Sequence, residues 1–590
     1  MKRYNFSEII IFIVGILLFF IPLVPDEKIT RWKLWVLETG LFSVLLLWLG
    51  YKILYSRIIF KISELNKPVF CWLVFIIFMY LISKNKNVAE LELYRTVVSV
   101  SSFFLFSNVV SDIKGRKTII ICWLIGGFLS AIYGIITHYG GFWIIATPQV
   151  DRIFSTFGNP IFFAVFLVAT IPLAIFKLIE EKEIAYKVIW FFMSISFVVA
   201  LFFTKSRAGW IAFVVSILVY IFLSLDSKVK KLLLVSVLLI FAIVFVLKTR
   251  NVWVRQQGHL LIWRDSLRML FNKPLLGVGL GAFHISFPKY ASEQLKRIWP
   301  QHQNIVNDAH SEFVQILAEL GLVGFGLFLW LIFSFLYSIK QFYKQPHIKE
   351  EILLFTALFS SAIAILVQNL FSVDMRFTIS SFYIFSVFGL IASYSSIKTK
   401  ELKLDFLSKS VVIIFFLVVI GFFESRMVIK QYRSWKIVFE SKDFLDKRII
   451  NAEEQKNIIH KMLATNPADA RLYFKLGYLW ANEIKTNRES AKLAIENFTK
   501  AAQLDPAVEH GGAFNNLGNI YFTLGDRTKA KENYIKAISI NPKLIDAHLN
   551  LGIAYYYEGK LNESAVEFET VLKLDPKNAS AIYMLKKMRE

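Results

Sequence analysis

Cysteine and charge are both scarce in this chain of 590 residues. The two cysteines, Cys71 and Cys122, lie inside apolar runs, which excludes a disulfide framework and a zinc site of cysteine spacing. Only 19% of the residues are charged, too few for a soluble protein of this length, whereas 56% are hydrophobic and the mean hydropathy is +0.53. The composition therefore predicts a polytopic membrane protein.

Acidic residues are the minority among the charges, and the formal net charge is +23. The basic residues cluster in short loops between apolar runs, which is typical of orientation signals rather than of a nucleic-acid surface, so we expect no nucleic-acid partner. The N-terminus carries Lys2 and Arg3 before an apolar run and imitates a signal peptide. No small-residue cleavage site follows, so we interpret this run as an uncleaved first span.

Long apolar runs dominate the first 430 residues. A helix needs about 20 apolar residues to cross the hydrocarbon core of a bilayer. By that measure the sequence predicts an all-α transmembrane bundle of about 12–13 spans in a domain covering residues 1–430. The predicted spans are 9–25, 34–54, 68–83, 93–110, 118–138, 161–179, 187–204, 209–225, 231–247, 312–339, 352–371, 378–394 and 411–429.

The distribution of lysine and arginine predicts the orientation. If the N-terminus is cytoplasmic, the basic loops fall on the cytoplasmic side, and the opposite short loops hold only Arg152 and Arg376. We therefore expect a multi-pass protein of the cytoplasmic (inner) membrane. Thirteen spans place the long loop 248–307 and the segment after residue 430 on the periplasmic or extracellular side, and one miscounted span would invert the side of that segment.

A period of 34 residues begins after the last apolar run. Leu517, Gly518 and Tyr521 recur as Leu551, Gly552 and Tyr555, a pattern that resembles the tetratricopeptide repeat. We predict an α-solenoid within residues 431–590, with repeats near 470–507, 511–544 and 545–578, the first of them lengthened by about five residues near 486–490. Such solenoids bind proteins or peptides, so a protein partner is expected here.

Several polar residues are predicted to gather on the outer face. Outer arginines oppose the usual charge bias, and a guanidinium group suits phosphate oxygens. An isolated arginine at the end of a span is usually an interfacial anchor, but several of them beside a histidine favour an anionic lipid headgroup handled next to a general base. The residues are Arg152, Asn159, Arg207, Arg264, His310, Asp374 and Arg376.

The stretch "NDAHSEFVQILAELG" runs from that outer loop into an apolar span. We predict that Asp308 caps the helix and that His310 lies in its first turn, where the helix dipole keeps the imidazole neutral and usable as a base. Asp308, His310 and Glu312 include metal-ligating types, but their close spacing does not aim all three at one point. We therefore expect no metal and no cofactor.

Glu319 lies deeper in the same span, at the end of a polar stripe with Ser311 and Gln315. A carboxylate inside a membrane is costly and needs a partner, for which Arg207 is one candidate. The segment 277–281, Gly-Val-Gly-Leu-Gly, resembles a nucleotide-binding loop, but no strand–turn–helix unit surrounds it, so we interpret it as flexible interfacial backbone.

These motifs resemble those of the O-antigen ligase family, membrane glycosyltransferases of the GT-C type. The resemblance covers roughly residues 118–394 and depends on the order and spacing of four segments. They are "RIFSTFGNP" at 152–160, "TKSRAGW" at 204–210, "IWRDSLRMLFNKPLLGVGLGAF" at 262–283 and "NDAHSEFVQILAELGLVG" at 307–324.

The resemblance implies metal-independent, inverting transfer of a glycan from polyprenyl (undecaprenyl) diphosphate to an acceptor hydroxyl. Arg207 and Arg264 would hold the donor diphosphate and His310 would be the base, whereas the roles of Arg152, Asn159 and Glu319 stay open. The family label favours an O-antigen ligase acting on lipid A–core in lipopolysaccharide biosynthesis. An O-antigen or exopolysaccharide polymerase and a protein O-oligosaccharyltransferase share these motifs, so the acceptor is a glycan, lipid or protein.

Two hypotheses from other classes remain. A polysaccharide transporter or flippase would place polar groups along a path through the bilayer or contain inverted repeats. The predicted spans outside 312–339 contain few charges and no internal repeat. A scaffold whose function is the repeats alone would need only one span as an anchor, so the many spans argue against it.

Overall fold

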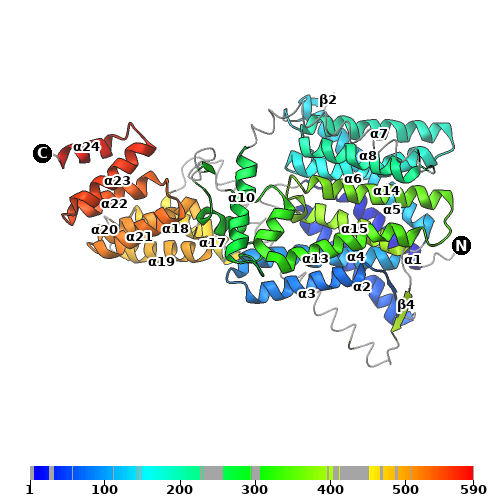
Figure 1. Cartoon of the computed structure of the whole chain (residues 1–590), viewed down its shortest axis with the longest axis horizontal. Helices are drawn as coiled ribbons and strands as arrows, with labels where there is room; N and C mark the ends of the chain where they lie inside the picture. Colours follow the sequence, from blue (N-terminus) through cyan, green and yellow to red (C-terminus); the bar gives the residue numbers. More distant parts are fainter. Residues whose placement is uncertain are drawn as a thin grey trace.

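The computed structural model describes residues 6–25, 32–55, 58–225, 257–295, 306–394, 398–402, 451–465, 470–484 and 489–588, apart from isolated positions within these ranges. Figure 1 shows long helices lying side by side in one bundle, and a stack of shorter helices beyond α10 (Gln257–Asn272). The predicted domain boundary at residues 430 and 431 lies outside the described residues.

Among the described residues, six helices are long and apolar enough to cross a membrane, which agrees with a multi-pass protein. The shorter helices α1 (Phe6–Phe20), α3 (Asn66–Ile82) and α15 (Thr378–Tyr394) coincide with further predicted spans, as do α2 (Trp32–Tyr55) and α4 (Lys86–Val109). Predicted span 231–247 and nearly all of 411–429 lie outside the described residues. The six are α5 (Ile113–His138), α6 (Pro160–Glu180), α7 (Ile184–Thr204), α8 (Arg207–Ser224), α13 (Glu312–Phe342) and α14 (Lys349–Gln368).

The membrane helices are held together by close backbone approach. In lipid, apolar side chains gain little from leaving the solvent, so packing and small residues at the contacts carry the association. A side chain at Gly126 of α5 would come within 2.2 Å of the Phe19 carbonyl oxygen, and one at Gly389 of α15 within 2.6 Å of the Phe103 carbonyl oxygen. These two glycines therefore allow α1 to pack against α5 and α4 against α15.

Two short strand pairs accompany the helices and were not predicted. Strand β1 (Ile58–Ile62) pairs antiparallel with β4 (Lys398–Leu402), and β2 (Gly141–Phe142) forms a hairpin with β3 (Ile145–Ala146). Strand β1 lies between α2 and α3, β4 follows α15, and the hairpin lies between α5 and α6, so the all-α prediction is confirmed for the bundle and for the solenoid.

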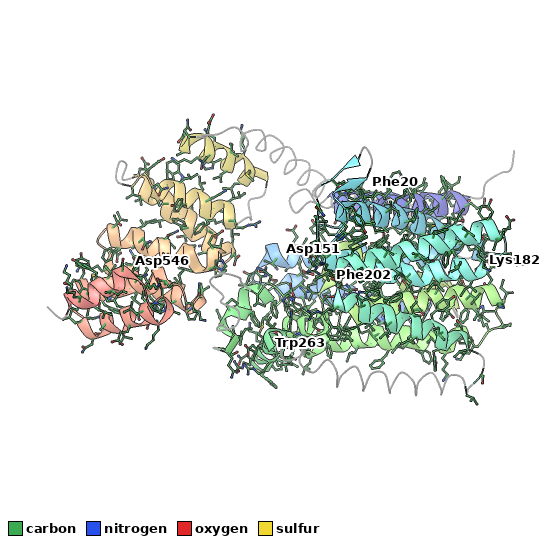
Figure 2. The ribbon with its side chains drawn as sticks, turned by 90° about the horizontal axis from the view of Figure 1, so that it is seen from above. Phe20, Asp151, Lys182, Phe202, Trp263 and Asp546 are labelled. Carbon is green, nitrogen blue, oxygen red and sulfur yellow. The ribbon has the colours of Figure 1, made fainter. Side chains whose placement is uncertain are left out.

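The two ends of the bundle differ in chemistry. Figure 2 places Asp151 at the end that faces the repeats and Lys182 at the far end. Near Lys182, Glu180 accepts hydrogen bonds from Lys117 and Lys177, both at 2.6 Å. The residues discussed below as a site belong to the end near Asp151.

The C-terminal helices form antiparallel pairs that stack on one another. They are α17 (Ala452–Thr465), α18 (Ala470–Ala481), α19 (Glu489–Leu504), α20 (Gly512–Thr523), α21 (Arg527–Ile540), α22 (Ile545–Tyr557), α23 (Leu561–Leu574) and α24 (Ala579–Lys587). A side chain at Gly518 would come within 2.4 Å of the Tyr534 ring, and one at Gly552 within 2.8 Å of Phe568. The repeated glycine therefore leaves the space that an aromatic ring from the second helix of each pair occupies.

The extra residues of the first repeat are divided between two connections. The α18–α19 connection spans 482–488, and the α19–α20 connection spans 505–511, whereas the equivalent α21–α22 connection spans only 541–544. The extra residues predicted near 486–490 belong to the first of these connections, in which residues 485–488 lie outside the described residues, and the longer α19–α20 connection was not predicted. The second insertion contains the short helix η3 (Val508–Gly511).

Candidate active site

The connection before α13 gives His310 an unusual backbone. The helix begins at Glu312, so the predicted cap by Asp308 and the placement of His310 in the first turn are wrong. Instead Asp308 Oδ1 accepts the backbone N–H of His310 at 2.9 Å, and His310 has φ +50°. The first helical N–H, that of Glu312, donates to the carbonyl oxygens of Asn369 and Ser372, both at 2.9 Å, so the backbone of the next connection satisfies this end group of the helix.

Asp308 also orients the imidazole. Its Oδ1 lies 3.2 Å from His310 Nδ1, and each of the two side chains is about one-third exposed. A carboxylate at Nδ1 favours the tautomer with the proton on that atom, which places the lone pair on Nε2. The His259 ring from α10 lies edge-to-face at 4.6 Å between ring centroids, and burial, followed by the charge of His310, lowers the pKa of His259.

The strained backbone conformation of His310 is held in place by the hydrogen bonds of the preceding residue, Ala309. Trp263 Nε1 of α10 donates to the Ala309 carbonyl oxygen at 2.9 Å, and the Ala309 N–H donates to Gln315 Oε1 at 2.6 Å. A non-glycine residue with φ near +50° costs about 1–3 kcal/mol and persists only where its surroundings over-determine it. Both hydrogen-bonding groups of Ala309 are clamped here, so α10 and α13 together fix His310.

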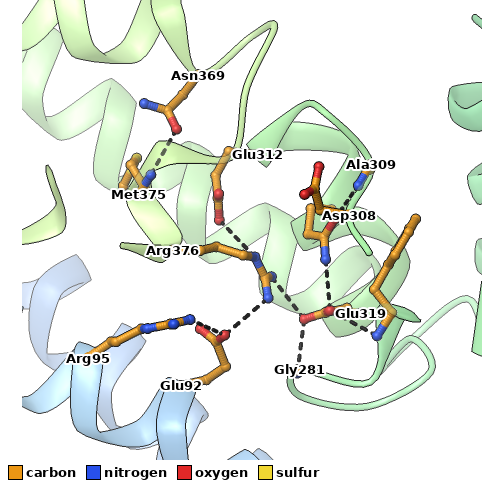
Figure 3. Close-up of polar contacts among 12 residues, drawn as sticks. Glu92, Arg95, Gly281, Asp308, Ala309, Glu312, Glu319, Asn369, Met375 and Arg376 are labelled. Atoms are coloured by element: carbon orange, nitrogen blue, oxygen red, sulfur yellow. Dashed lines mark hydrogen bonds and ion pairs between the residues drawn. The ribbon is translucent and has the colours of Figure 1, made fainter. Parts of the chain in front are cut away.

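Glu319 is the buried anchor of this arrangement (Figure 3). Its Oε1 accepts from Gln315 Nε2 at 2.9 Å and from the Phe283 N–H at 3.0 Å. Its Oε2 accepts from the Gly281 N–H at 2.9 Å and pairs with Arg376 Nη2 at 2.8 Å. The partner of Glu319 is therefore Arg376, and the candidate suggested by the sequence, Arg207, was wrong.

The glycine segment 277–281 packs closely against α13 and is not the flexible backbone that the sequence predicted. Gly277, Gly279 and Gly281 have φ of +66°, +119° and +69°, values that glycine adopts readily. A side chain at Gly277 would come within 2.3 Å of the Glu319 backbone, and Gly279 N–H donates to the Glu319 carbonyl oxygen at 3.0 Å. Gly321, at φ +64°, interrupts the helical backbone of α13 and forms a kink at this point.

Arg376 joins three carboxylates from two helices. Besides Glu319 it lies 3.4 Å from Glu92 of α4 and 3.6 Å from Glu312, and Glu92 also pairs with Arg95 at 2.6 Å (Figure 3). Burial lowers the pKa of Arg376, but the carboxylates outweigh this and raise it above its ordinary value. A cavity of about 60 Å³ opens beside Arg376, with Glu92, Arg95 and Glu312 in its lining.

Asp374 connects the same corner to α6. Its Oδ2 accepts from Ser372 Oγ at 2.5 Å and from Gln368 Nε2 at 2.9 Å, and Gln368 Nε2 also donates to the Ile161 carbonyl oxygen. Burial raises the pKa of Asp374 to about 7, and the charge of Asp308 adds to this rise. Asn159 caps α6 through its side chain, which accepts the Ile161 N–H at 2.8 Å.

The arginines expected to hold a diphosphate lie at the same end on other elements. Arg207 begins α8, is exposed, and has no hydrogen bond or ion pair among the described residues. Arg152 is also exposed and donates from Nε to the Thr204 carbonyl oxygen at 3.1 Å. Arg264 of α10 is about half-exposed and donates to Gln294 and Ser292.

The Ala309–Gln315 and Gln315–Glu319 hydrogen bonds join the Asp308–His310 pair to the Glu319–Arg376 pair, and Ser372 joins Glu312 of α13 to Asp374. Arg152, Arg207 and Arg264 lie on other segments. Sequence reasoning missed Glu92, His259 and Trp263 as parts of this site. It noted Gln315 in a polar stripe and noted the segment 277–281, but it did not predict what either of them contacts.

Comparison with known proteins assigns both parts of the chain. Residues 191–329 match the O-antigen ligase family, residues 518–559 match a TPR repeat model, and residues 545–578 match a tetratricopeptide repeat model. The family match includes α10, the glycine segment and the start of α13, so it covers Arg207, Arg264, His310 and Glu319.

Curated relatives are similar over short stretches. The UDP-N-acetylglucosamine--peptide N-acetylglucosaminyltransferase of Giardia intestinalis is 34% identical over 108 residues, which are 18% of this chain and 7% of that protein. Photosystem I assembly protein Ycf3 of Prochlorococcus marinus (strain MIT 9211) is 30% identical over 120 residues, which are 20% of this chain and 65% of that protein. The chain therefore spans less than two thirds of either relative.

Two solved structures are also similar in part. The first TPR of Spaghetti (RPAP3), bound to an HSP90 peptide, is 24% identical and covers 20% of this chain and 92% of its own, with a TM-score of 0.18. MamA is 24% identical and covers 26% of this chain and 82% of its own, with a TM-score of 0.21. Scores this low establish no common fold for the whole chain. From the family matches and the helices, the chain is a multi-pass membrane protein with an O-antigen ligase domain followed by C-terminal tetratricopeptide repeats.

Proposed function

We propose that this protein transfers a glycan from a polyprenyl diphosphate to an acceptor hydroxyl at the outer face of the cytoplasmic membrane. The match of residues 191–329 to the O-antigen ligase family supports a ligase- or polymerase-type transfer of a glycan at the membrane. The observation that carries the proposal is the Asp308–His310 pair at 3.2 Å, held where an apolar span meets a polar loop. A lipid-linked donor and a water-facing acceptor can meet at such a boundary.

The proposed step is one displacement. His310 Nε2 takes the proton of the acceptor hydroxyl while that oxygen attacks the anomeric carbon, and the bond from this carbon to the diphosphate oxygen breaks. Attack from the face opposite the leaving group inverts the anomeric centre. The polyprenyl diphosphate leaves with the bonding electron pair, and the imidazolium is stabilised by Asp308.

Arg207 and Arg264 are the proposed binders of the donor diphosphate. Negative charge grows on the leaving oxygens during the step, and a guanidinium group can bind two of them at once. Exposed Arg207 can do this directly, whereas Arg264 would exchange its hydrogen bonds to Ser292 and Gln294 for phosphate oxygens. Arg376 pairs with Glu319 at 2.8 Å and lies within 3.6 Å of Glu92 and Glu312, so we assign it a supporting role.

The acceptor defines the finer function. We favour an O-antigen ligase that uses lipid A–core, and the alternatives are a polymerase that extends another repeat unit and a protein O-oligosaccharyltransferase. Deleting the gene distinguishes them, because polyprenyl-linked glycan should accumulate in each case while a different product disappears. Loss of glycan from lipid A–core alone supports the ligase. Loss of glycan from proteins supports the protein O-oligosaccharyltransferase, and shorter glycan chains support the polymerase.

The mechanism is tested by glycan transfer from purified polyprenyl-diphosphate donor in detergent. His310→Ala should lower turnover by about 10²–10⁴-fold with donor affinity unchanged, and His460→Ala, an exposed histidine of α17, is the matched control. EDTA should not reduce wild-type turnover. Near-normal transfer by His310→Ala contradicts the base assignment, and a requirement for a divalent ion contradicts the mechanism.

The side of the membrane is tested by labelling. A cysteine at exposed Asn562 of α23 should react with an impermeant maleimide in intact cells or spheroplasts, and a cysteine at Lys228 should not. Protection of the Asn562 site would place the repeats on the cytoplasmic side and would separate them from the proposed acceptor.

A further inference from the structure

A second cavity lies where the repeats meet the membrane domain. It measures about 160 Å³ and is lined by His284 and Asn307 from one side and by Arg471, Asp505, Glu509 and His510 from the other. Helix α21 approaches the short helix η1 (Phe287–Lys289) beside it, so the two parts are in contact there. The fold of a repeat solenoid does not by itself predict a function for this cavity.

The repeat side of the cavity is built by the second insertion of the first repeat. Glu509 and His510 have φ of +46° and +58°, a strained conformation for both residues. The Nδ1 atom of His510 is buried and has no hydrogen-bond partner among the described residues. A buried polar atom without a partner calls for an explanation, and a ligand in the cavity would provide one.

The membrane side of the cavity is tied to the candidate active site. His284 follows Phe283, whose N–H is held by Glu319, and Asn307 immediately precedes Asp308. Consecutive Cα atoms lie 3.8 Å apart, so the Cα of Asn307 is at most about 11 Å from that of His310. A molecule in the cavity is therefore near enough to present an attached group to His310.

We infer that this cavity is a subsite for a saccharide of the acceptor, an inference that rests on the proposed function. Its lining mixes donors with acceptors, as sugar hydroxyls require, since each hydroxyl can both donate and accept. The lining contains one arginine, Arg471, and two carboxylates, Asp505 and Glu509, so its net charge does not favour an anion. At about 10–15 Å³ for each water, the cavity has room for roughly ten waters, which is comparable to one monosaccharide unit.

The inference assigns the repeats a direct part in acceptor choice. The strained insertion would contribute His510 to one wall while the loop before His310 contributes the other, so a saccharide would be held between the two domains. A peptide bound by the repeats is the competing occupant, and a Ser/Thr-containing peptide serves as its probe.

The first experiment measures binding and needs no transfer. Full-length protein in nanodiscs is mixed with methyl glycosides of glucose, galactose, mannose and heptose, and saturation transfer from protein to sugar is recorded by NMR. We expect a signal for at least one glycoside with the wild type and its loss with His510→Gly. Glycine adopts positive φ without strain, so this variant removes the imidazole and keeps the backbone. His460→Ala is again the control, and thermal unfolding of each variant checks the fold.

The second experiment separates this inference from the proposed function. With lipid A–core from the deletion strain as acceptor, His510→Gly should raise the acceptor KM about 2- to 10-fold, the loss expected for one hydrogen bond, with kcat and donor affinity unchanged. Wild type without any transfer to lipid A–core would refute the ligase assignment, while the NMR result would still decide the subsite. A folded His510→Gly protein with unchanged sugar binding, or peptide binding that His510→Gly abolishes in place of sugar binding, would overturn the inference.

Discussion

Replacing Glu319 by glutamine isolates the chemistry of the buried anchor, because the two side chains have nearly the same size. The carboxylate accepts four interactions, two on each oxygen. An amide has only one oxygen, so its NH₂ group must face either Gly281 N–H and Arg376, or Phe283 N–H and Gln315 Nε2. Either orientation opposes donors with donors and leaves two buried donors unsatisfied.

The size of the effect follows from that count. Each buried donor left without a partner costs about 1–3 kcal/mol, so Glu319→Gln should destabilise the protein by about 2–6 kcal/mol. In one orientation Gly281 N–H and Arg376 lose their acceptor, and in the other Phe283 N–H and Gln315 lose theirs, which loosens the hold of Gln315 on Ala309. His310 would then relax from its strained conformation, so transfer should fall as well.

Unfolding by SDS in mixed micelles measures the free energy, and transfer from the lipid-linked donor measures activity. Glu183→Gln, an exposed change at the far end of the bundle, is the matched control and should stay within about 0.5 kcal/mol of the wild type. A Glu319→Gln protein with unchanged stability and unchanged transfer would show that the four interactions do not support the site.

Three further predictions concern the arginines, the pH dependence and the repeats. Arg207→Lys and Arg264→Lys should each weaken donor binding, measured by equilibrium titration with polyprenyl diphosphate, because lysine lacks the two-pronged donor; unchanged affinity would contradict their assignment. Asp374 keeps its proton up to a pKa of about 7 in the folded protein but loses it near 3.8 when unfolded, so its contribution to stability is present at low pH and is lost as pH rises from about 4 to 7. In the wild type the free energy of unfolding should therefore decrease by up to about 4 kcal/mol across this pH range, and in Asp374→Asn this decrease should be absent. The free energy of unfolding measured at several pH values tests this, and the same pH profile in both proteins would refute the raised pKa of Asp374. Truncation after Tyr432 should lower transfer efficiency or change acceptor choice while leaving some transfer, and complete loss in a protein that still inserts and folds would contradict this division of labour.

The architecture of both parts could be predicted from short-range patterns. An apolar run of span length has few alternatives to a membrane helix, because lipid offers no partner to unpaired backbone groups. The Leu-Gly and tyrosine spacing at Leu517, Gly518 and Tyr521 likewise led to the solenoid, since the glycine must admit the ring of Tyr534. The alternation of spans also predicted that polar residues far apart in the chain share one end of the bundle.

The sequence also identified most of the residues at the candidate site, but not how they pair. His310 and Glu319 stood out because ionisable groups at a membrane boundary are costly, and this signal depends only on residue type and position. The structure shows other partners for these two residues than the sequence predicted. Asp308 binds His310 and does not cap the helix, and Glu319 pairs with Arg376 and not with Arg207.

Only the tertiary structure decided these pairings, because each depends on which helix faces reach one another. Trp263 binds the carbonyl oxygen of Ala309 and Gln315 binds its N–H, and the two side chains come from different helices. Gly277 looked like a flexible loop residue, yet it packs against the backbone of Glu319 where a side chain would collide. Periodicity specifies the face of a helix that is apolar, but hydrogen-bond partners are chosen by the packing distance and rotation of whole helices, and these emerge only when all of the helices are packed together.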